Sequence, residues 1–259
     1  MLSKAQIARI KSLADKKNRD IEGLFVAEGT KIIKDALESG VNIKYLIATD
    51  DWIKSNESGL AVTNLEITPV SSETMKKISS FRSPAQVLAV FEKPAKSDPP
   101  LHEAEITLAL DGIQDPGNFG TIIRLCEWFG ITTIICSEST VDAYNPKVIQ
   151  SSMGACLRVN IYYSDLSLYI KRYKHQTKNP VYGTFLSGNP LGVSKLSQQC
   201  LIILGNEGNG ISQRLEILID TKINIPAYHS PNMQMESLNV AVAAGIICYE
   251  FRKRGLPLL

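Results

Sequence analysis

The C-terminal two thirds of the chain alternates short apolar runs with segments of helical periodicity. The runs are apolar at nearly every position rather than at every second one, and they read ITLALDGI, TTIICS, VYGTFLSG, LIILGNEG and INIP. Continuous hydrophobicity of this kind is typical of strands that are buried on both faces of a mostly parallel sheet. The pattern therefore predicts an α/β domain over residues 106–259, in which a ligand would bind at the carboxyl ends of the strands.

The N-terminal part repeats this alternation on a smaller scale. Strand-like runs read LFVAEG, IKYLIATD and QVLAVFE, and segments with helical spacing read TKIIKDALESG and SSETMKKISS. They predict a small α/β domain over residues 1–97. A charged stretch that contains prolines follows, and we interpret residues 98–105 as an interdomain linker.

The chain begins with a basic segment. Ile7, Ile10 and Leu13 recur at helical spacing, which predicts one basic amphipathic helix. Its charges are Lys4, Arg9, Lys11, Lys16, Lys17 and Arg19, against Asp15 alone. Such a face is either simply solvated or a contact for a polyanion, and the charge by itself does not decide between the two.

Composition excludes several classes of protein. Over 259 residues, 28 lysines and arginines balance 26 aspartates and glutamates, so the net charge nominates no polyanionic partner. No apolar run approaches the ~18 residues of a membrane span, and the N-terminus lacks the apolar core of a secretory signal. The cysteines are scattered singly and the histidines lie far apart. We therefore expect a cytoplasmic protein with buried, reduced thiols, no metal site and no membrane.

The first candidate loop for chemistry is QDPGNFGTIIRLCEWFG, which follows the run ITLALDGI. Pro116, Gly117 and Gly120 favour a tight turn, and Asn118 can cap the helix that starts there. Arg124 lies farther along this helix among apolar neighbours, where an arginine needs an ion-pair partner or a ligand. The glycine spacing matches neither a Walker A loop nor GxGxxG, which disfavours a nicotinamide-dependent oxidoreductase.

Two further loops carry polar residues after apolar runs. The glycines of GNEGNG, with Glu207 among them, allow backbone groups to approach a ligand, although a flexible turn would use them too. After INIP, the chain places Ser237 and Asn239 near the start of a helix that is apolar nearly all round. Such a helix requires cover from its own sheet or from another subunit. These loops predict a ligand site without naming a reaction.

The loops together resemble the motifs of the SpoU (TrmH-type) branch of the SPOUT RNA methyltransferases. The three motifs read DPGNFGTIIR, LIILGNEGNGIS and, after IP, ESLNVAVAAGI. The N-terminal part, with FVAEGTKIIKDAL and FRSPAQVLAVF, is similar to the substrate-binding domain of that family, which is related to ribosomal-protein folds. The resemblance implies a parallel α/β sheet whose C-terminal part is threaded into a trefoil knot, and a homodimer formed through helices of the knotted domain.

The same resemblance implies methyl transfer from S-adenosylmethionine to a ribose 2′-hydroxyl in ribosomal or transfer RNA. It places these residues in the active site: Arg124, Asn118, Glu207, Ser237 and Asn239. It places these at the cofactor: Thr184, Leu204, Gly205, Gly208, Ile225, Pro226 and Leu238. Arg124 takes the position of the arginine proposed to deprotonate the hydroxyl. A guanidinium is a poor base, so stabilising the developing alkoxide is an equally sound role.

The third loop departs from the family pattern. After Ile225 and Pro226 this chain has AYHSPNMQM, which is longer than the usual loop and contains no glycine. The contacts made by Tyr228 to Met235 therefore stay open. If this loop closed the pocket, the chain would be a non-catalytic RNA-binding protein that retains the methyltransferase fold, and this is the alternative to an enzyme.

Overall fold

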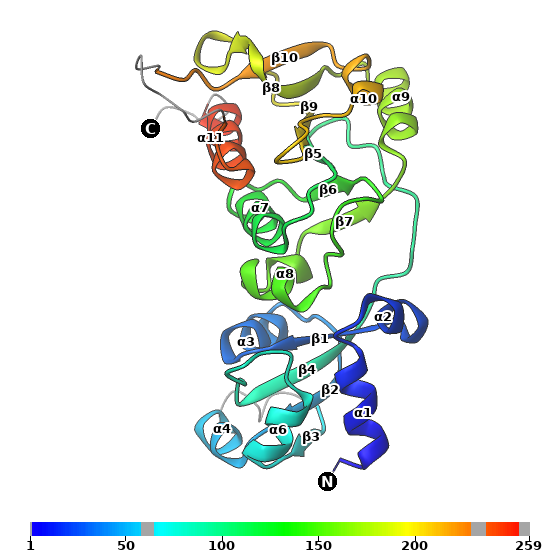
Figure 1. Ribbon diagram of the computed structural model, residues 1–259, viewed down its shortest axis with the longest axis vertical. Helices are drawn as coiled ribbons and strands as arrows, with labels where there is room; N and C mark the ends of the chain where they lie inside the picture. The colour runs from blue at the N-terminus through cyan, green and yellow to red at the C-terminus, as the bar shows by residue number, and fades with distance from the viewer. Residues whose placement is uncertain (1, 58–64, 229–236, 254–259) are drawn as a thin grey trace. The chain divides into compact units, whose positions relative to one another are not determined.

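The computed structural model describes residues 2–57, 65–228 and 237–253 (Figure 1). Contacts within the chain divide it into two compact units. The first unit comprises residues 1–95 together with 142–158, and the second comprises residues 96–141 and 159–259. Residues 142–158 thus group with the N-terminal unit, although they follow a strand of the second unit along the chain.

The first unit is built on a four-stranded sheet in the order β1-β4-β2-β3. The pairs β1–β4 and β2–β4 are antiparallel, and β2–β3 is parallel. Its strands are β1 (Leu24–Glu28), β2 (Ile43–Ala48), β3 (Ile67–Pro69) and β4 (Val87–Glu92). Its helices are α1 (Lys4–Ser12), α2 (Lys16–Glu22), α3 (Thr30–Glu38), α4 (Asp50–Ser55), α6 (Ser72–Ile78), α8 (Pro146–Ser151) and the 3₁₀ turn η1 (Ala155–Leu157). All strands and helices predicted over residues 24–92 are present, and α4 and β3 are additional.

One apolar cluster joins the sheet of this unit to α1 and α6. Ile10 and Leu13 pack there together with Met75 and Ile78 of α6 and with strand residues such as Leu88. The apolar stripe that predicted an amphipathic helix therefore faces the sheet. Lys4 and Lys11, on the same helix, are exposed.

The basic N-terminal segment forms two helices, so the prediction of a single one is wrong. Asp15 accepts a hydrogen bond from the backbone N–H of Lys17 and caps α2, which starts a new helix at this point. Arg19 is also absent from the basic surface, because only 1% of it is exposed. Its guanidinium pairs with Asp142 at 2.7 Å and donates to the carbonyl oxygens of Leu13 and Ala14.

The second unit contains a six-stranded sheet in the order β10-β8-β9-β5-β6-β7. Every pair in it is parallel, which confirms the predicted parallel sheet. Its strands are β5 (Ile106–Asp111), β6 (Thr133–Cys136), β7 (Asn160–Tyr163), β8 (Val181–Pro190), β9 (Cys200–Gly205) and β10 (Thr221–Asn224). Its helices are α7 (Pro116–Trp128), α9 (Leu166–Thr177), α10 (Gln213–Glu216), α11 (Val240–Lys253) and the 3₁₀ turn η2 (Leu191–Val193).

Helices cover this sheet on both faces (Figure 1). On one face, Tyr169 and Tyr173 of α9 and Leu215 of α10 pack with Leu201 and Ile203 of β9. On the other face lie α7 and α11. Because both faces are covered, β5 and β9 are buried at every position, which explains their continuous hydrophobicity.

Some predictions concern parts that the structure does not describe. The chain passes from β10 to α11 through residues 229–236, which lie outside the described residues, and the trefoil knot stays a prediction.

In the described ranges, no helix has the length and apolar character needed to cross a membrane. Across the same residues, no cluster of histidine, cysteine, aspartate or glutamate could hold a metal ion.

Candidate functional site

Two loops of the second unit leave its sheet at the same edge. β5 and β9 are neighbouring parallel strands, and Asp111 lies opposite Gly205 at their carboxyl ends. The chain continues from β5 into α7, and from β9 into a turn in which Asn206 and Gly210 exchange backbone hydrogen bonds. The first two predicted loops therefore lie next to each other, at the edge where parallel sheets bind ligands.

Asp115, rather than Asn118, caps α7. Its Oδ1 accepts a hydrogen bond from the backbone N–H of Asn118 at 2.7 Å, and Pro116 occupies the first turn of the helix. The prediction that Asn118 caps this helix is wrong, because Asp115 already satisfies the first-turn N–H. The side chain of Asn118 is thereby left to contact other loops.

Asn118 joins the three predicted loops through its side-chain amide. Its Nδ2 donates to Oε1 of Glu207 at 2.9 Å, and its Oδ1 accepts from Nδ2 of Asn239 at 2.9 Å. We call Asn118, Glu207 and Asn239 the polar bridge. Each member comes from a different predicted motif; Glu207 and Asn239 are exposed to solvent, and Asn118 is half-buried. The structure thus brings together three of the five side chains that were predicted to form the active site.

Asn239 also caps α11. Its Oδ1 accepts hydrogen bonds from the backbone N–H groups of Ala241 at 2.9 Å and Val242 at 3.3 Å. The helix begins at Val240, so Ser237 lies ahead of it. Ser237 is exposed and makes no side-chain hydrogen bond with the described residues. The structure therefore does not join Ser237 to the polar bridge.

α7 and α11 lie side by side and run in the same direction. Asn118 and Asn239 connect their first turns. Farther along, a Cβ added to Gly245 would lie 3.6 Å from the side chain of Leu125. At the far end, Nε and Nη2 of Arg252 donate to the carbonyl oxygens of Phe129 and Gly130, each at 2.7 Å. The polar bridge is therefore anchored on a helix pair that is fixed at both ends.

Arg124 stands apart from the polar bridge. It is exposed, and it makes no hydrogen bond or ion pair with any described residue, so a surface ion pair does not explain it there. It lies six positions after Asn118, which at about 100° per residue places the two about 120° apart around α7. Within one copy of the chain, the structure does not bring Arg124 into contact with the other predicted active-site residues.

The predicted cofactor residues lie in or directly after three neighbouring strands, in the β9 turn and ahead of α11. Leu204 and Gly205 end β9, and Thr184 lies in β8 just beyond its pairing with β9. Ile225 and Pro226 follow β10. Gly208 and Leu238 lie in the β9 turn and before α11, respectively, and both are exposed. The backbone comes close at Gly205, where an added Cβ would lie 2.2 Å from the carbonyl carbon of Gly210.

Two residues that the sequence patterns did not single out also hold this edge of the sheet. Nδ2 of Asn206 donates to the carbonyl oxygen of Gly112 at 2.7 Å. Oδ2 of Asp111 accepts from the backbone N–H of Ser212 at 2.8 Å, and Asp111 is buried. Their signal in the sequence was their place, since each is a short polar side chain at or directly after the end of a buried strand.

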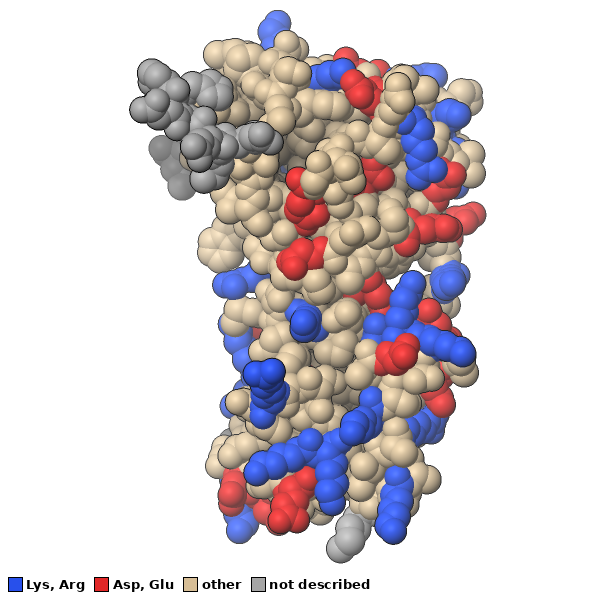
Figure 2. All heavy atoms as spheres, viewed as in Figure 1, with Lys and Arg blue, Asp and Glu red and all other residues tan. Residues whose placement is uncertain are grey.

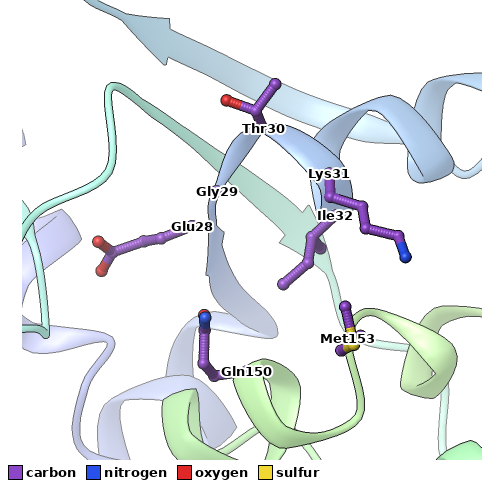
Figure 3. Close-up of a pocket in the computed structure, with 7 residues that line it drawn as sticks. All are labelled: Glu28, Gly29, Thr30, Lys31, Ile32, Gln150 and Met153. Carbon is purple, nitrogen blue, oxygen red and sulfur yellow. The ribbon is translucent and has the colours of Figure 1, made fainter.

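The first unit contains a separate cavity of about 230 Å³ (Figure 3). Its lining residues are Glu28, Gly29, Thr30, Lys31, Ile32, Gln150 and Met153. The carboxylate of Glu28 already accepts hydrogen bonds from Oγ of Ser79 at 2.6 Å and from the backbone N–H of Ser80 at 2.7 Å. We propose no catalytic or binding role for this cavity, because the carboxylate of Glu28 is already hydrogen-bonded to Ser79 and Ser80.

Comparisons with known proteins agree with this geometry. Residues 105–249 match the model of the SpoU rRNA Methylase family, and residues 4–89 match that of the MRM3-like substrate binding domain. The 23S rRNA (guanosine(2553)-2′-O)-methyltransferase RlmP of Bacillus subtilis is 31% identical, over 93% of this chain and 94% of its own length.

Solved structures have the same fold. A putative RNA methyltransferase of the TrmH family from Porphyromonas gingivalis is 35% identical, with a TM-score of 0.86 over 98% of this chain and 99% of its own. The AdoMet-bound rRNA methyltransferase of Sinorhizobium meliloti is 28% identical, with a TM-score of 0.84 over 99% of this chain and 97% of its own. With the family model matching more than half of its residues, the chain belongs to the SpoU rRNA methylase family.

Proposed function

We propose that this member of the SpoU rRNA methylase family transfers the methyl group of S-adenosylmethionine to the 2′-hydroxyl of a ribose in ribosomal RNA. The polar bridge carries the proposal, because it gathers side chains of all three motifs at the edge where a parallel sheet binds its ligand. The relative from Bacillus subtilis is named as a 2′-O-methyltransferase of 23S rRNA and matches nearly the whole chain, which supports ribose as the acceptor.

The strand ends fit S-adenosylmethionine as the cofactor. Asn224, directly before Ile225, has a buried Oδ1 without a hydrogen-bond partner. Such an acceptor favours a ligand that brings an N–H or O–H group, and the adenosine part of this cofactor carries both. Thr184 and Ile225 are half-buried and Pro226 is exposed, so these residues are accessible to a ligand. When bound, the cofactor supplies an already activated methyl group on a sulfonium.

The chain's own residues then align the acceptor. The polar bridge fixes three loops relative to one another, and fixed alignment of two reactants supplies a large part of the rate of a group transfer. Arg124 has no acidic partner among the described residues, so the charge of its guanidinium is available to a ligand. That charge suits an RNA phosphate or the oxygen that becomes negative as the hydroxyl loses its proton. We assign Arg124 this electrostatic role.

An exposed apolar stripe supports a homodimer. Val242, Ile246 and Tyr249 are 53%, 38% and 55% exposed and follow one another along one face of α11, beside α7, where Trp128 is 82% exposed. A second copy of the chain would cover this stripe. Arg124 lies one turn before Trp128 on the same face of α7, so the second copy would also lie beside Arg124.

We further propose residues 1–97 as the RNA-binding domain, 98–105 as a linker and 106–259 as the methyltransferase domain of a cytoplasmic enzyme. Lysine and arginine side chains gather over the first unit on the face shown in Figure 2. Lys4, Lys11, Lys76 and Lys77, on the neighbouring helices α1 and α6, are all exposed. Unpaired lysines of this kind bind phosphate without regard to sequence.

Calorimetry combined with a transfer assay tests the proposal. The wild-type chain should bind S-adenosylmethionine and pass its methyl group to ribosomal RNA. Arg124→Ala should keep cofactor binding and lose at least about 100-fold in transfer, whereas Lys171→Ala, which removes another exposed cation on a helix, should keep both. Binding of RNA without any binding of the cofactor would instead support the non-catalytic alternative.

A further inference from the structure

Asn206 uses the two ends of its side chain for different purposes. Its Oδ1 accepts from the backbone N–H groups of Gly208 at 2.9 Å and Asn209 at 3.1 Å, and so shapes the turn in which Glu207 lies. Its Nδ2 donates to the carbonyl oxygen of Gly112 at 2.7 Å, beyond the end of β5. The oxygen therefore builds the turn, and the nitrogen fastens it to the neighbouring loop.

The far end of the same segment is also fastened to β5. The backbone N–H of Ser212 donates to Oδ2 of Asp111, and Asp111 lies opposite Gly205 in the sheet. Residues 206–212 are thus held at both ends against residues 111 and 112. Within this segment, the side-chain hydrogen bond to the carboxylate of Glu207 comes from Asn206, with Nδ2 at 3.5 Å from Oε2.

We propose that Asn206 is a positioning residue for methyl transfer. It sets the carboxylate of Glu207 at the distance from which Oε1 accepts the hydrogen bond of Asn118, and through Asn118 it sets Asn239. The expected effect on kcat rests on the proposed function, because it is measured as methyl transfer. It predicts that Asn206 acts on turnover through Glu207 and touches neither RNA nor the reacting atoms.

Asn206→Asp separates the two ends of the side chain. An aspartate keeps an oxygen for the N–H groups of Gly208 and Asn209, so the turn survives. It loses the donor to Gly112 and brings a negative charge beside the carboxylate of Glu207, which moves that carboxylate away. Asn209→Asp is the matched control, because it adds the same charge to the same turn and the side chain of Asn209 bonds no described residue.

The kinetic test compares Asn206→Asp, Glu207→Gln, their double variant and Asn209→Asp. We expect Asn206→Asp to lower kcat about 10- to 100-fold with KM for RNA changed less than about threefold, and Asn209→Asp to resemble the wild type. In the Glu207→Gln background, Asn206→Asp should cost less than about threefold, because the group it acts through is already altered. Equal losses in both backgrounds, or a loss equal to that of Asn209→Asp, would overturn the inference.

An activity-independent readout keeps the inference testable if the proposed function fails. With ¹⁵N-labelled asparagine, the side-chain amide signal of Asn118 is assigned from its disappearance in Asn118→Ala. This signal should move in Asn206→Asp toward its position in Glu207→Gln and stay in place in Asn209→Asp. An unmoved signal in Asn206→Asp would show that Asn206 does not position Glu207, whatever the wild-type chain does to RNA.

Discussion

Nδ2 of Asn239 donates to Oδ1 of Asn118 at 2.9 Å across 121 positions of the sequence. The bond connects the first turns of two parallel helices that follow different strands of one sheet. Because Asn239 also caps α11 and Asn118 also holds Glu207, a change at Asn118 should disturb the ends of three elements at once. The predictions below start from this bond.

Asn118→Asp should abolish most methyl transfer while leaving the fold intact. The aspartate still accepts from Asn239, but it places a negative charge against the carboxylate of Glu207, where the native amide donates. We expect a rate loss of about 100-fold, which corresponds to about 2.7 kcal/mol. Initial rates with ribosomal RNA measure it, and Thr121→Ala, one turn farther along α7, serves as the control. A rate within threefold of wild type would contradict the assigned role of the polar bridge.

Gly205→Ala should disrupt the end of β9. The new Cβ would lie 2.2 Å from the carbonyl carbon of Gly210, closer than backbone atoms tolerate, so the turn must shift. We expect weaker binding of S-adenosylmethionine by calorimetry together with a lower Tm. Gly192→Ala is the control, because an added Cβ there meets nothing within 4 Å. Identical cofactor affinity in both variants would argue against a cofactor site at this turn.

The ion pair of Arg19 and Asp142 should contribute strongly to the stability of the first unit. Their side chains are 2% and 7% exposed, so Asp142→Asn leaves a buried guanidinium without its counter-charge. Urea unfolding should show a loss of about 3–5 kcal/mol. The pair of Arg9 and Glu22 is largely exposed and screened by water, so Glu22→Gln should lower the free energy of unfolding far less. Equal effects of the two substitutions would refute the distinction.

The buried cysteines should make the folded state less stable at high pH. None of the five forms a disulfide and all are buried, and burial raises the pKa of Cys248 to about 12 and that of Cys126 well above its usual range. In the unfolded chain these thiols ionise near their ordinary pKa of 9.0. Between that value and about 12, the unfolded state binds fewer protons than the folded state, so the free energy of unfolding falls as pH rises.

Unfolding in urea at pH 8 and pH 10 measures this effect, with alkylation of the native protein as a second readout. The thiols should resist iodoacetamide until the chain unfolds, because the reactive thiolate does not form in a buried site. Rapid alkylation of Cys248 in the native state would contradict its placement in the core.

The sheet of the second unit was predictable because its evidence is local. Continuous apolar runs such as ITLALDGI reflect burial on both faces, which is typical of parallel strands such as β5 and β9. The prediction that Arg19 lies on the surface was wrong because the evidence against it is not local. Its partner Asp142 lies 123 positions away, and charge patterns along a segment carry no information about such a contact.

The candidate site was predictable in its members and not in its contacts. The resemblance placed Asn118 in the active site and its position near a helix start allowed it to cap that helix, but nothing near it in the sequence reveals that Glu207 approaches from 89 positions away. Asn206 was overlooked because the glycines around it were enough to account for a turn, so no role was sought for its side chain. Its role depends on the carbonyl oxygen of Gly112, a group that every residue has and that no sequence pattern marks.

The most direct test of the central claim is the chemical position of the transferred methyl group. Ribosomal RNA is incubated with the wild-type chain and S-adenosylmethionine carrying a ¹³C-labelled methyl group, digested to nucleosides and analysed by mass spectrometry. The account predicts the label on the ribose of one 2′-O-methylated nucleoside, and about 100-fold slower labelling with Asn118→Asp. Label on a base, or no label with the wild-type chain, would contradict it.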